Sequence, residues 1–307
     1  MTTFRPVSNP HSEAWRREAG PLPAAGARGT LVIVGGSERL DKELHILQTY
    51  LRLVDAVPGR RDLVLLTAAT GHPEILGGEY HRLFTALGVP AHHIHMPEVA
   101  TRESADHPAT AALLRGAAGI YMTGGDQVAL MDVLHGTAVE AALCDAYVSG
   151  AVIGGTSAGA TAMGDPMIAR GGGSGELRRG MVTIRRGLGL LGEHVFVDTH
   201  FGERGRFPRM CAALAEAPQV LGVGIDENTG LVLHPGARVV EVIGRGVVYF
   251  LDGHATAPVD VALGSAFSLT PLSLHVLTEG ARYDLAARRP VSEAGVGNQA
   301  ADTVAEL

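Results

Sequence analysis

A serine between two glycines lies at the centre of residues 151–160, which read AVIGGTSAGA. Ser157 is flanked by Gly155 and Gly159, which makes the Gly-x-Ser-x-Gly pattern of a nucleophile elbow. A serine at a sharp strand-to-helix turn takes strained backbone angles, and neighbours without a Cβ allow the turn to close. The hydroxyl is then presented for attack, and the N–H of Ala158 points to where an oxyanion would form. The pattern predicts a serine nucleophile, with a glycine-rich loop that has no chemistry as the alternative.

A serine nucleophile needs a base, and the base needs a group that orients it. The chain has 14 histidines, and His200 differs from the rest because it ends a short strand among polar residues. Asp226 and Glu227 follow a strongly apolar strand, where a carboxylate is costly unless it is paired. The residues therefore favour Ser157, His200 and one of these two acids.

A different order of the three residues is also open. In α/β-hydrolases the acid precedes the histidine in the chain. That order would combine Ser157 with Asp226 or Asp252 as acid and with His254 or His275 as base. Those histidines fall in a less regular C-terminal region, so serine, histidine, carboxylate is the preferred order.

Two further glycine pairs follow apolar strands. The segment GGDQ at residues 124–127 contains Gly125, whose N–H we expect to complete an oxyanion hole with that of Ala158. Gln127 in the same segment offers a donor and an acceptor to a substrate. The pair at residues 35–36 lacks the full Gly-x-Gly-x-x-Gly pattern, so we do not assign a nucleotide site to it. Close packing of a helix on a sheet explains either pair without chemistry.

Composition indicates a globular protein and excludes several partners. The chain has 307 residues, 46% of them hydrophobic, with a net charge of -7 and a pI near 6.0. No basic surface favours nucleic acid or an anionic membrane, and no apolar run approaches the roughly 18 residues of a membrane span. The two cysteines have no metal-ligand spacing and indicate thiols. We expect a cytoplasmic protein.

Histidines 92, 93 and 95, with His81 upstream, could suggest a metal site. Successive residues of a strand point to opposite faces, so these side chains cannot all converge on one ion. We predict no metal and no other cofactor.

Strands alternate with helices over most of the chain. Apolar runs predict strands at residues 30–34, 63–66 and 119–122 and a further strand that leads to Ser157, each followed by helical spacing. The expected helices are residues 40–53, 79–87, 109–117, 128–134 and 139–148. Such alternation predicts an α/β fold, with a mainly parallel sheet flanked by helices on both faces.

The pattern changes after the elbow. Residues 164–193 are rich in glycine and arginine and predict a long functional loop, within which residues 171–179 are either a lid or an insertion. Beyond a strand at 195–197, a helix at 206–216 and a strand at 220–225, three segments predict antiparallel strands at 231–233, 238–243 and 247–250. We expect a flexible arm at residues 1–28, one catalytic domain with a β-rich C-terminal part at 29–285, and a polar tail at 286–307.

Four segments together resemble the cyanophycinases, which are serine peptidases related to the aspartyl dipeptidases. The segments are GGDQ at 124–127, GGTSAGA at 154–160, DTHFGERGRFPRM at 198–210 and GIDENTG at 224–230. Each is weak alone, but they occur in order and at compatible spacing over residues 31–233. The resemblance implies a class I glutamine amidotransferase-like sandwich, no metal and a homodimer. It also implies hydrolysis of cyanophycin, an aspartate polymer with arginine on each β-carboxyl, to β-Asp-Arg dipeptides.

The resemblance also implies roles for individual residues. Ser157 would be the nucleophile, His200 the base and Glu227 the acid. The residues that would line the substrate pocket are Gln127, Asp198, Thr199, Arg204, Arg206 and Arg209. Arginines suit the carboxylates of such a peptide, and a carboxylate suits its guanidinium groups.

Thr199 departs from the family pattern, because cyanophycinases commonly carry glutamine there. The shorter side chain lacks an amide donor, so we expect an altered preference for β-Asp-Arg. The alternatives are an α-aspartyl dipeptidase or an isopeptidase acting on another arginine-containing peptide, and a peptide-binding protein without turnover.

Overall fold

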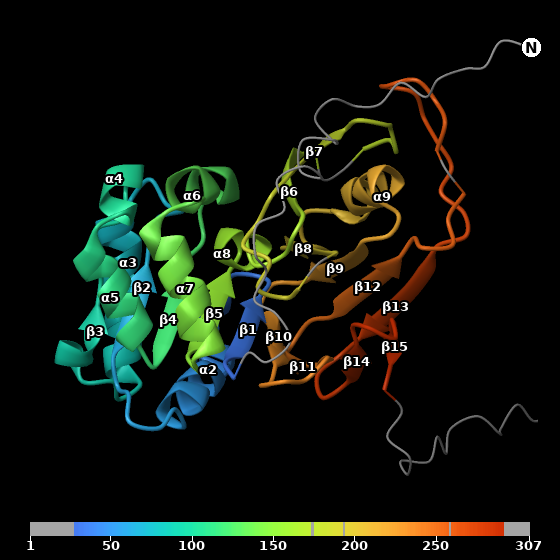
Figure 1. Cartoon of the computed structure of the whole chain (residues 1–307). Helices are drawn as coiled ribbons and strands as arrows, with labels where there is room; N and C mark the ends of the chain where they lie inside the picture. Colours follow the sequence, from blue (N-terminus) through green and yellow to red (C-terminus); the bar gives the residue numbers. More distant parts are fainter. Residues whose placement is uncertain (1–27, 173–174, 193, 258, 292–307) are drawn as a thin grey trace, which may run out of the picture.

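The computed structural model describes residues 28–172, 175–192, 194–257 and 259–291, and these residues form three β-sheets (Figure 1). The expected arm lies outside the described residues except for residue 28, and so does residue 292 onward of the expected tail. No helix in the described ranges is long and apolar enough to cross a membrane.

The largest sheet has nine strands within the described residues. Its central strands β1, β5, β4, β2 and β3 are parallel, and β10, β11, β14 and β15 extend it in antiparallel fashion. In spatial order the strands are β15 (Arg289–Pro290), β14 (Arg282–Asp284), β11 (Val239–Gly244), β10 (Thr229–Leu233), β1 (Thr30–Val34), β5 (Val152–Thr156), β4 (Gly119–Met122), β2 (Leu63–Leu66) and β3 (Ile94–His95).

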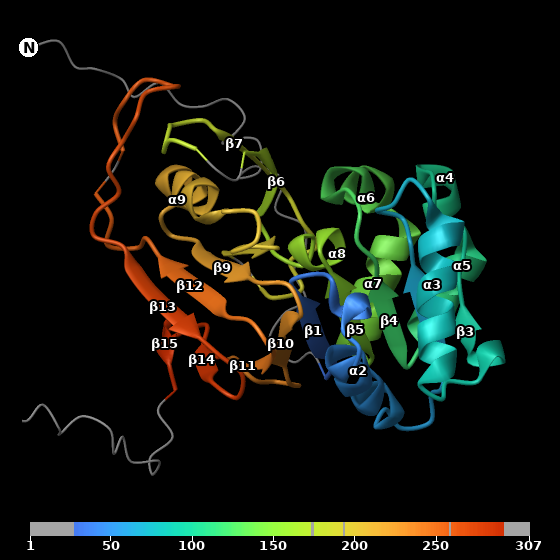
Figure 2. The same ribbon diagram turned by 180° about the vertical axis from the view of Figure 1, so that it is seen from behind.

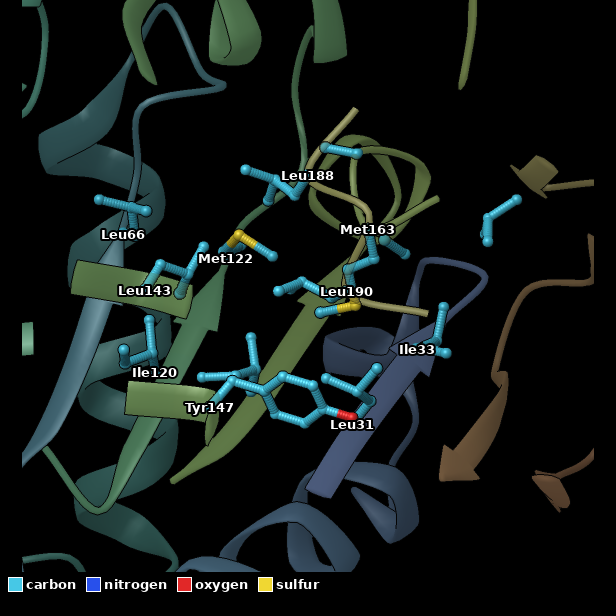
Figure 3. Packing of buried hydrophobic residues seen from close by; sticks show 14 of the residues in the cluster. Leu31, Ile33, Leu66, Ile120, Met122, Leu143, Tyr147, Met163, Leu188 and Leu190 are labelled. Atoms are coloured by element: carbon cyan, nitrogen blue, oxygen red, sulfur yellow. The ribbon is translucent and has the colours of Figure 1, made fainter. Parts of the chain in front are cut away.

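Helices cover both faces of the parallel half because its strands are apolar on both sides. Leu31 and Ile33 of β1 belong to one core cluster, and Val32 and Val34 belong to the other. Figure 3 shows the first cluster, where side chains from β1, β4 and α7 gather. The first face is covered by α5 (Pro108–Gly116), α6 (Gln127–Leu134) and α7 (Ala138–Val148), and the second by α2 (His45–Asp55) and α3 (Pro73–Ala86).

A second sheet lies beside the antiparallel half of the first. It consists of β13 (Ser273–Leu277), β12 (Val248–Asp252), β9 (Leu221–Ile225) and β8 (Val195–Thr199). Alternate residues of β8 again separate the layers: Val195 and Val197 pack into the core shared with the large sheet, whereas Phe196 packs under α9 (Phe207–Glu216). The two sheets are therefore joined by one continuous apolar cluster.

Short elements complete the fold. They are η1 (Glu38–Leu40), η2 (Ala91–His93), α4 (Arg102–Ala105), α8 (Ala158–Thr161), β6 (Met167–Gly171) and β7 (Val182–Arg185). The last two pair with each other as an antiparallel hairpin near α9 (Figure 2).

The structure confirms the predicted fold class and corrects several details. The prediction of a loop throughout residues 164–193 was wrong, because β6 and β7 pair within it, and residues 173–174 of the suspected lid lie outside the described residues. The helix expected at 79–87 begins at Pro73, since a proline is accepted in the first turn. The helix expected at 40–53 begins at His45, after η1. Finally, β12 pairs with β9 and β13 in the second sheet and has no pairing with β11.

Candidate active site

The serine elbow joins β5 to α8. Ser157 has φ 51° and ψ -113°, which is a strained conformation for a residue with a side chain. A Cβ on Gly155 would lie 2.9 Å from the backbone of Gly159, and one on Gly159 would lie 2.5 Å from the carbonyl oxygen of Met122. Both flanking glycines are thus required by close backbone packing, as the motif predicted.

His200 and Glu227 reach the serine from the second sheet. His200 directly follows β8, and Glu227 lies two residues beyond β9. These strands are parallel and pair Thr199 with Ile225, so their carboxyl ends lie together. The Nε2 atom of His200 lies 2.8 Å from Ser157 Oγ, and its Nδ1 lies 2.6 Å from Glu227 Oε1. The three side chains form a continuous hydrogen-bonded chain.

The surroundings favour a neutral imidazole and an ionised acid. Burial lowers the pKa of His200 below its ordinary value; the hydrogen bond to Glu227 opposes this, and the charges of Arg204 and Arg206 add to it. For Glu227, burial by itself would raise the pKa, but hydrogen bonds with His200 and Ser37 lower it overall. An imidazole that is unprotonated near pH 7 can accept a proton from a serine hydroxyl.

The end of β1 and the turn after it hold the backbone of Ser157, of His200 and of the residue next to Glu227. Three successive carbonyl oxygens of this turn, at residues 34, 35 and 36, accept hydrogen bonds from the N–H groups of Ser157, His200 and Asn228, at 3.1, 2.8 and 2.8 Å. Asn228 directly follows Glu227. The glycine pair of this turn is visible in the sequence, but its connection with the elbow is not, because only the tertiary structure brings the segments together.

Gly36 explains why this turn is rich in glycine. Its φ is 113°, and a Cβ there would lie 2.3 Å from Cε1 of the His200 ring. The imidazole therefore packs directly on the backbone of the turn. Only glycine fits between β1 and the ring.

Two backbone N–H groups are available beside the serine. Within the described residues, neither Gly125 nor Ala158 donates its N–H to a protein acceptor. Ala158 is the first residue of α8, where N–H groups have no partner in the helix. A Cβ on Gly124 would lie 3.3 Å from the Ser157 Cβ, which places the Gly124–Gly125 turn next to the nucleophile. The arrangement is compatible with the predicted oxyanion hole.

Asp198 is placed differently from the expectation that it binds substrate directly. It is fully buried, and its Oδ2 atom accepts a 2.6 Å hydrogen bond from Arg209 Nε. Its Oδ1 atom accepts from Arg206 Nη1 at 2.9 Å and from the N–H of Thr199 at 3.0 Å. A carboxylate with these partners orients the two arginines and has no exposed surface for a ligand. The expectation differs because the sequence pattern did not reveal that Asp198 is buried together with these arginines.

Three other predicted pocket residues differ in what they offer. Thr199 is buried, with its hydroxyl 3.5 Å from that of Thr161 in α8, and so packs beneath the elbow. Gln127 donates its amide N–H groups to the carbonyl oxygens of Ile168 and Ala169 in β6, both at 3.0 Å. Arg204 is exposed. Gln127 is thus engaged in holding the hairpin, whereas Arg204 has its guanidinium in solvent.

The other acids and histidines considered lie elsewhere. Asp226 accepts a 2.8 Å hydrogen bond from the N–H of Gly202, and Asp252 pairs with Arg288 at 2.6 Å. His254 follows β12, and His275 lies in β13. The sequence order serine, histidine, Glu227 is the one that the structure brings together.

The histidine cluster lies at the opposite part of the sheet. Nδ1 of His93 lies 2.8 Å from Asp62, and Nε2 of His95 lies 3.2 Å from the same carboxylate. Across the described ranges, no group of three or more histidine, cysteine or acidic side chains is arranged to hold a metal ion.

Comparison with known proteins identifies the family. The model described as "Peptidase family S51" matches residues 31–239. The chain belongs to this peptidase family. It is a serine-type peptidase, and its substrate is a peptide.

Curated relatives and a solved structure agree with this assignment. A cyanophycinase from Trichormus variabilis is 35% identical over 261 residues, which cover 83% of this chain and 85% of the relative. One from Geminocystis herdmanii is 34% identical over 273 residues, covering 86% and 97%. The crystal structure of a peptidase from an acI-B1 actinobacterium matches with a TM-score of 0.64 at 24% identity, over 85% of this chain and 98% of that one. That structure has the same fold.

Proposed function

We propose that this serine peptidase is of the cyanophycinase type and releases β-Asp-Arg dipeptides from cyanophycin or a related aspartyl peptide. The observation that carries the proposal is the chain of contacts from Ser157 through His200 to Glu227, at 2.8 and 2.6 Å. The cyanophycinases at 34–35% identity over most of the chain support the substrate class.

The reaction proceeds through an acyl-enzyme. Ser157 Oγ attacks the scissile carbonyl while His200 Nε2 accepts its proton, and Glu227 holds the ring and stabilises its charged form. The N–H groups of Ala158 and Gly125 stabilise the oxyanion. His200 then returns the proton to the leaving amine, and a water molecule activated by the same histidine releases the acyl group.

The arginines beside the base select an anionic substrate. Arg206 and Arg209 share the single carboxylate of Asp198, so the three side chains together carry a net positive charge. Arg204 adds an exposed guanidinium. The positive charge of these arginines attracts the carboxylates of an aspartyl peptide. Thr199, packed beneath the elbow, adjusts this selectivity indirectly.

Incubation with cyanophycin and with a panel of α- and β-aspartyl dipeptides tests the proposal, with products identified by mass spectrometry. Release of β-Asp-Arg by the wild type and none by Ser157→Ala is the expected result. Cleavage of only the α-aspartyl peptides would make the chain an α-aspartyl dipeptidase. A wild type that binds these peptides but neither cleaves them nor reacts with a serine-directed phosphonate would be a binding protein.

The oligomeric state and the cellular compartment are also proposed. Resemblance to the cyanophycinases favours a homodimer, and the composition, with two cysteines that indicate thiols, favours the cytoplasm. Light scattering on the purified chain tests the dimer, and fractionation of cells that express it tests the compartment.

A further inference from the structure

A buried carboxylate lies next to the site but outside the proposed triad. Glu38 is the first residue of η1 and is 1% exposed. Its Oε2 atom accepts a 2.6 Å hydrogen bond from the hydroxyl of Thr156, and its Oε1 atom accepts one of 2.8 Å from Tyr121 and a second from Tyr80. Three hydroxyl groups therefore converge on one carboxylate in the core.

The donors come from three different elements of the fold. Tyr80 lies in α3, Tyr121 in β4 and Thr156 at the end of β5. Burial raises the pKa of both tyrosines well above the ordinary value, and the charge of Glu38 adds to the effect. Both tyrosines therefore stay protonated and donate hydrogen bonds to Glu38.

The two ends of this network lie next to the reacting groups along the chain. Thr156 immediately precedes Ser157 in the chain. On the other side, Glu38 directly follows Ser37, whose side chain hydrogen-bonds Glu227, and lies two residues from Gly36, on which the His200 ring packs. One carboxylate is thus linked to the strand of the nucleophile and to the turn that carries the base and the acid.

A requirement for core stability alone does not explain this arrangement. Burying a carboxylate costs free energy that hydrogen bonds only offset, and a well-packed apolar side chain of similar size stabilises a core at least as well. What the carboxylate adds is direction, because each hydroxyl must point to it. Its contribution is therefore to geometry.

We propose that Glu38 is a positioning residue for the serine, histidine and acid. It locks the turn at residues 34–37 to the end of β5, so that the distance between Ser157 Oγ and His200 Nε2 is held at that of a hydrogen bond. The role rests on the proposed function, because positioning matters only where Ser157 is the nucleophile.

Two substitutions break the network from opposite sides. Glu38→Gln keeps the size of the side chain but replaces one acceptor oxygen with an amide nitrogen, which faces hydroxyl donors. Thr156→Val keeps the shape of threonine but removes its hydroxyl, whereas Thr156→Ser retains the hydroxyl and serves as the conservative rescue. Thr256→Val is the matched control, because it removes a buried hydroxyl that donates to Pro271 at 2.6 Å far from the elbow.

The readouts are the rate at which a fluorophosphonate labels Ser157, kcat and KM on a peptide that the wild type cleaves, and the melting temperature. We expect Glu38→Gln and Thr156→Val to lower the labelling rate and kcat about 10-fold or more with little change in KM, since small misplacements of a nucleophile have effects of up to about 100-fold. Thr156→Ser keeps the labelling rate near that of the wild type. Thr256→Val changes only the melting temperature.

Wild-type labelling rates in both Glu38→Gln and Thr156→Val would overturn the proposal, even if their melting temperatures fall, because the carboxylate would then serve stability alone. If Glu38→Gln does not fold, the Thr156→Val and Thr156→Ser pair decides in the same way. Absence of labelling at Ser157 in the wild type would instead overturn the proposed function, and the role of Glu38 with it.

Discussion

The two sheets contribute to the site in different ways. The large sheet supplies Ser157 through a local feature, because the strand, the strained turn and α8 are consecutive in the chain. The four-stranded sheet supplies His200 and Glu227 from the ends of two strands, 27 residues apart in the chain. In Figure 1, β8 and β9 lie beside α8, the helix that follows the serine. The nucleophile is thus positioned by local backbone geometry, and the base and acid by strand pairing.

The difference shows where the site is most dependent on tertiary contacts. The elbow depends on two glycines within two residues of the serine, whereas the histidine depends on a turn more than 160 residues away in the chain. Carbonyl oxygens of that turn hold both halves. The contact between the turn and the His200 ring therefore fixes the position of the four-stranded sheet relative to the large sheet at the site.

The largest effect is expected from the nucleophile itself. Ser157→Ala removes the attacking oxygen and lowers kcat on the order of 10⁶-fold, as in other serine peptidases. The melting temperature stays within a few degrees of that of the wild type, since Ala has the smaller side chain. Turnover measured by mass spectrometry and a thermal melt check both; turnover at even a tenth of the wild-type rate would exclude Ser157 as nucleophile.

The next effect tests the contact between the two sheets. Gly36→Ala places a Cβ against the His200 ring, so the base moves away from Ser157 and kcat falls roughly 100-fold. Gly88→Ala is the matched control, because its φ of 102° is similar but a Cβ there meets nothing within 4 Å. Equal kcat values in the two variants would contradict the prediction, because they would show that the added Cβ at Gly36 does not displace the histidine.

A third prediction concerns stability on the side of the base. Arg209→Met leaves the fully buried Asp198 without its two-point partner and lowers the free energy of unfolding by about 3 kcal/mol. Arg115→Met, which breaks an exposed pair with Asp145, lowers it by less than about 1 kcal/mol. Urea titrations of both variants measure the difference; similar losses would argue against a special contribution from the buried pair.

The smallest effect is a shift in pH dependence. His200 must be unprotonated to act as base, so activity rises with pH through its pKa, which burial and the nearby arginines lower. Arg204→Gln removes one positive charge, raises the pKa of His200 and moves the acidic limb of the kcat/KM profile to higher pH. Arg52→Gln on α2 is the control and leaves the limb unchanged. A shift to lower pH would contradict the assigned electrostatics.

The sequence predicted best what depends on neighbouring residues. Strands β1, β2 and β4 were predicted with the bounds that the structure shows, because each is a short apolar run that is followed by glycine or threonine. The elbow followed from its glycines. The hairpin of β6 and β7 was missed, because its strands are short and lie within a region, residues 164–193, that is rich in glycine and arginine.

Distance along the chain did not indicate which residues form the site, and the chemical type of the side chains indicated only some of them. His200 was selected by its place at the end of a strand, and the structure brings it to Ser157. Asp198 was expected in the substrate pocket but is buried with Arg206 and Arg209, since a pattern of charges does not reveal which of them pair with one another.

The amino-acid sequence by itself determined the α/β class, the strained serine turn and the set of residues able to act on an acyl group. These follow from apolar periodicity and from glycines next to a serine, which act over a few residues. The residues alone left Asp226 and Glu227 open, and the family resemblance pointed to Glu227; the tertiary structure places Glu227 against His200 and shows that the turn at residues 34–37 holds the site together. Both depend on strand pairing and on hydrogen bonds between distant segments, whose partners no local pattern specifies.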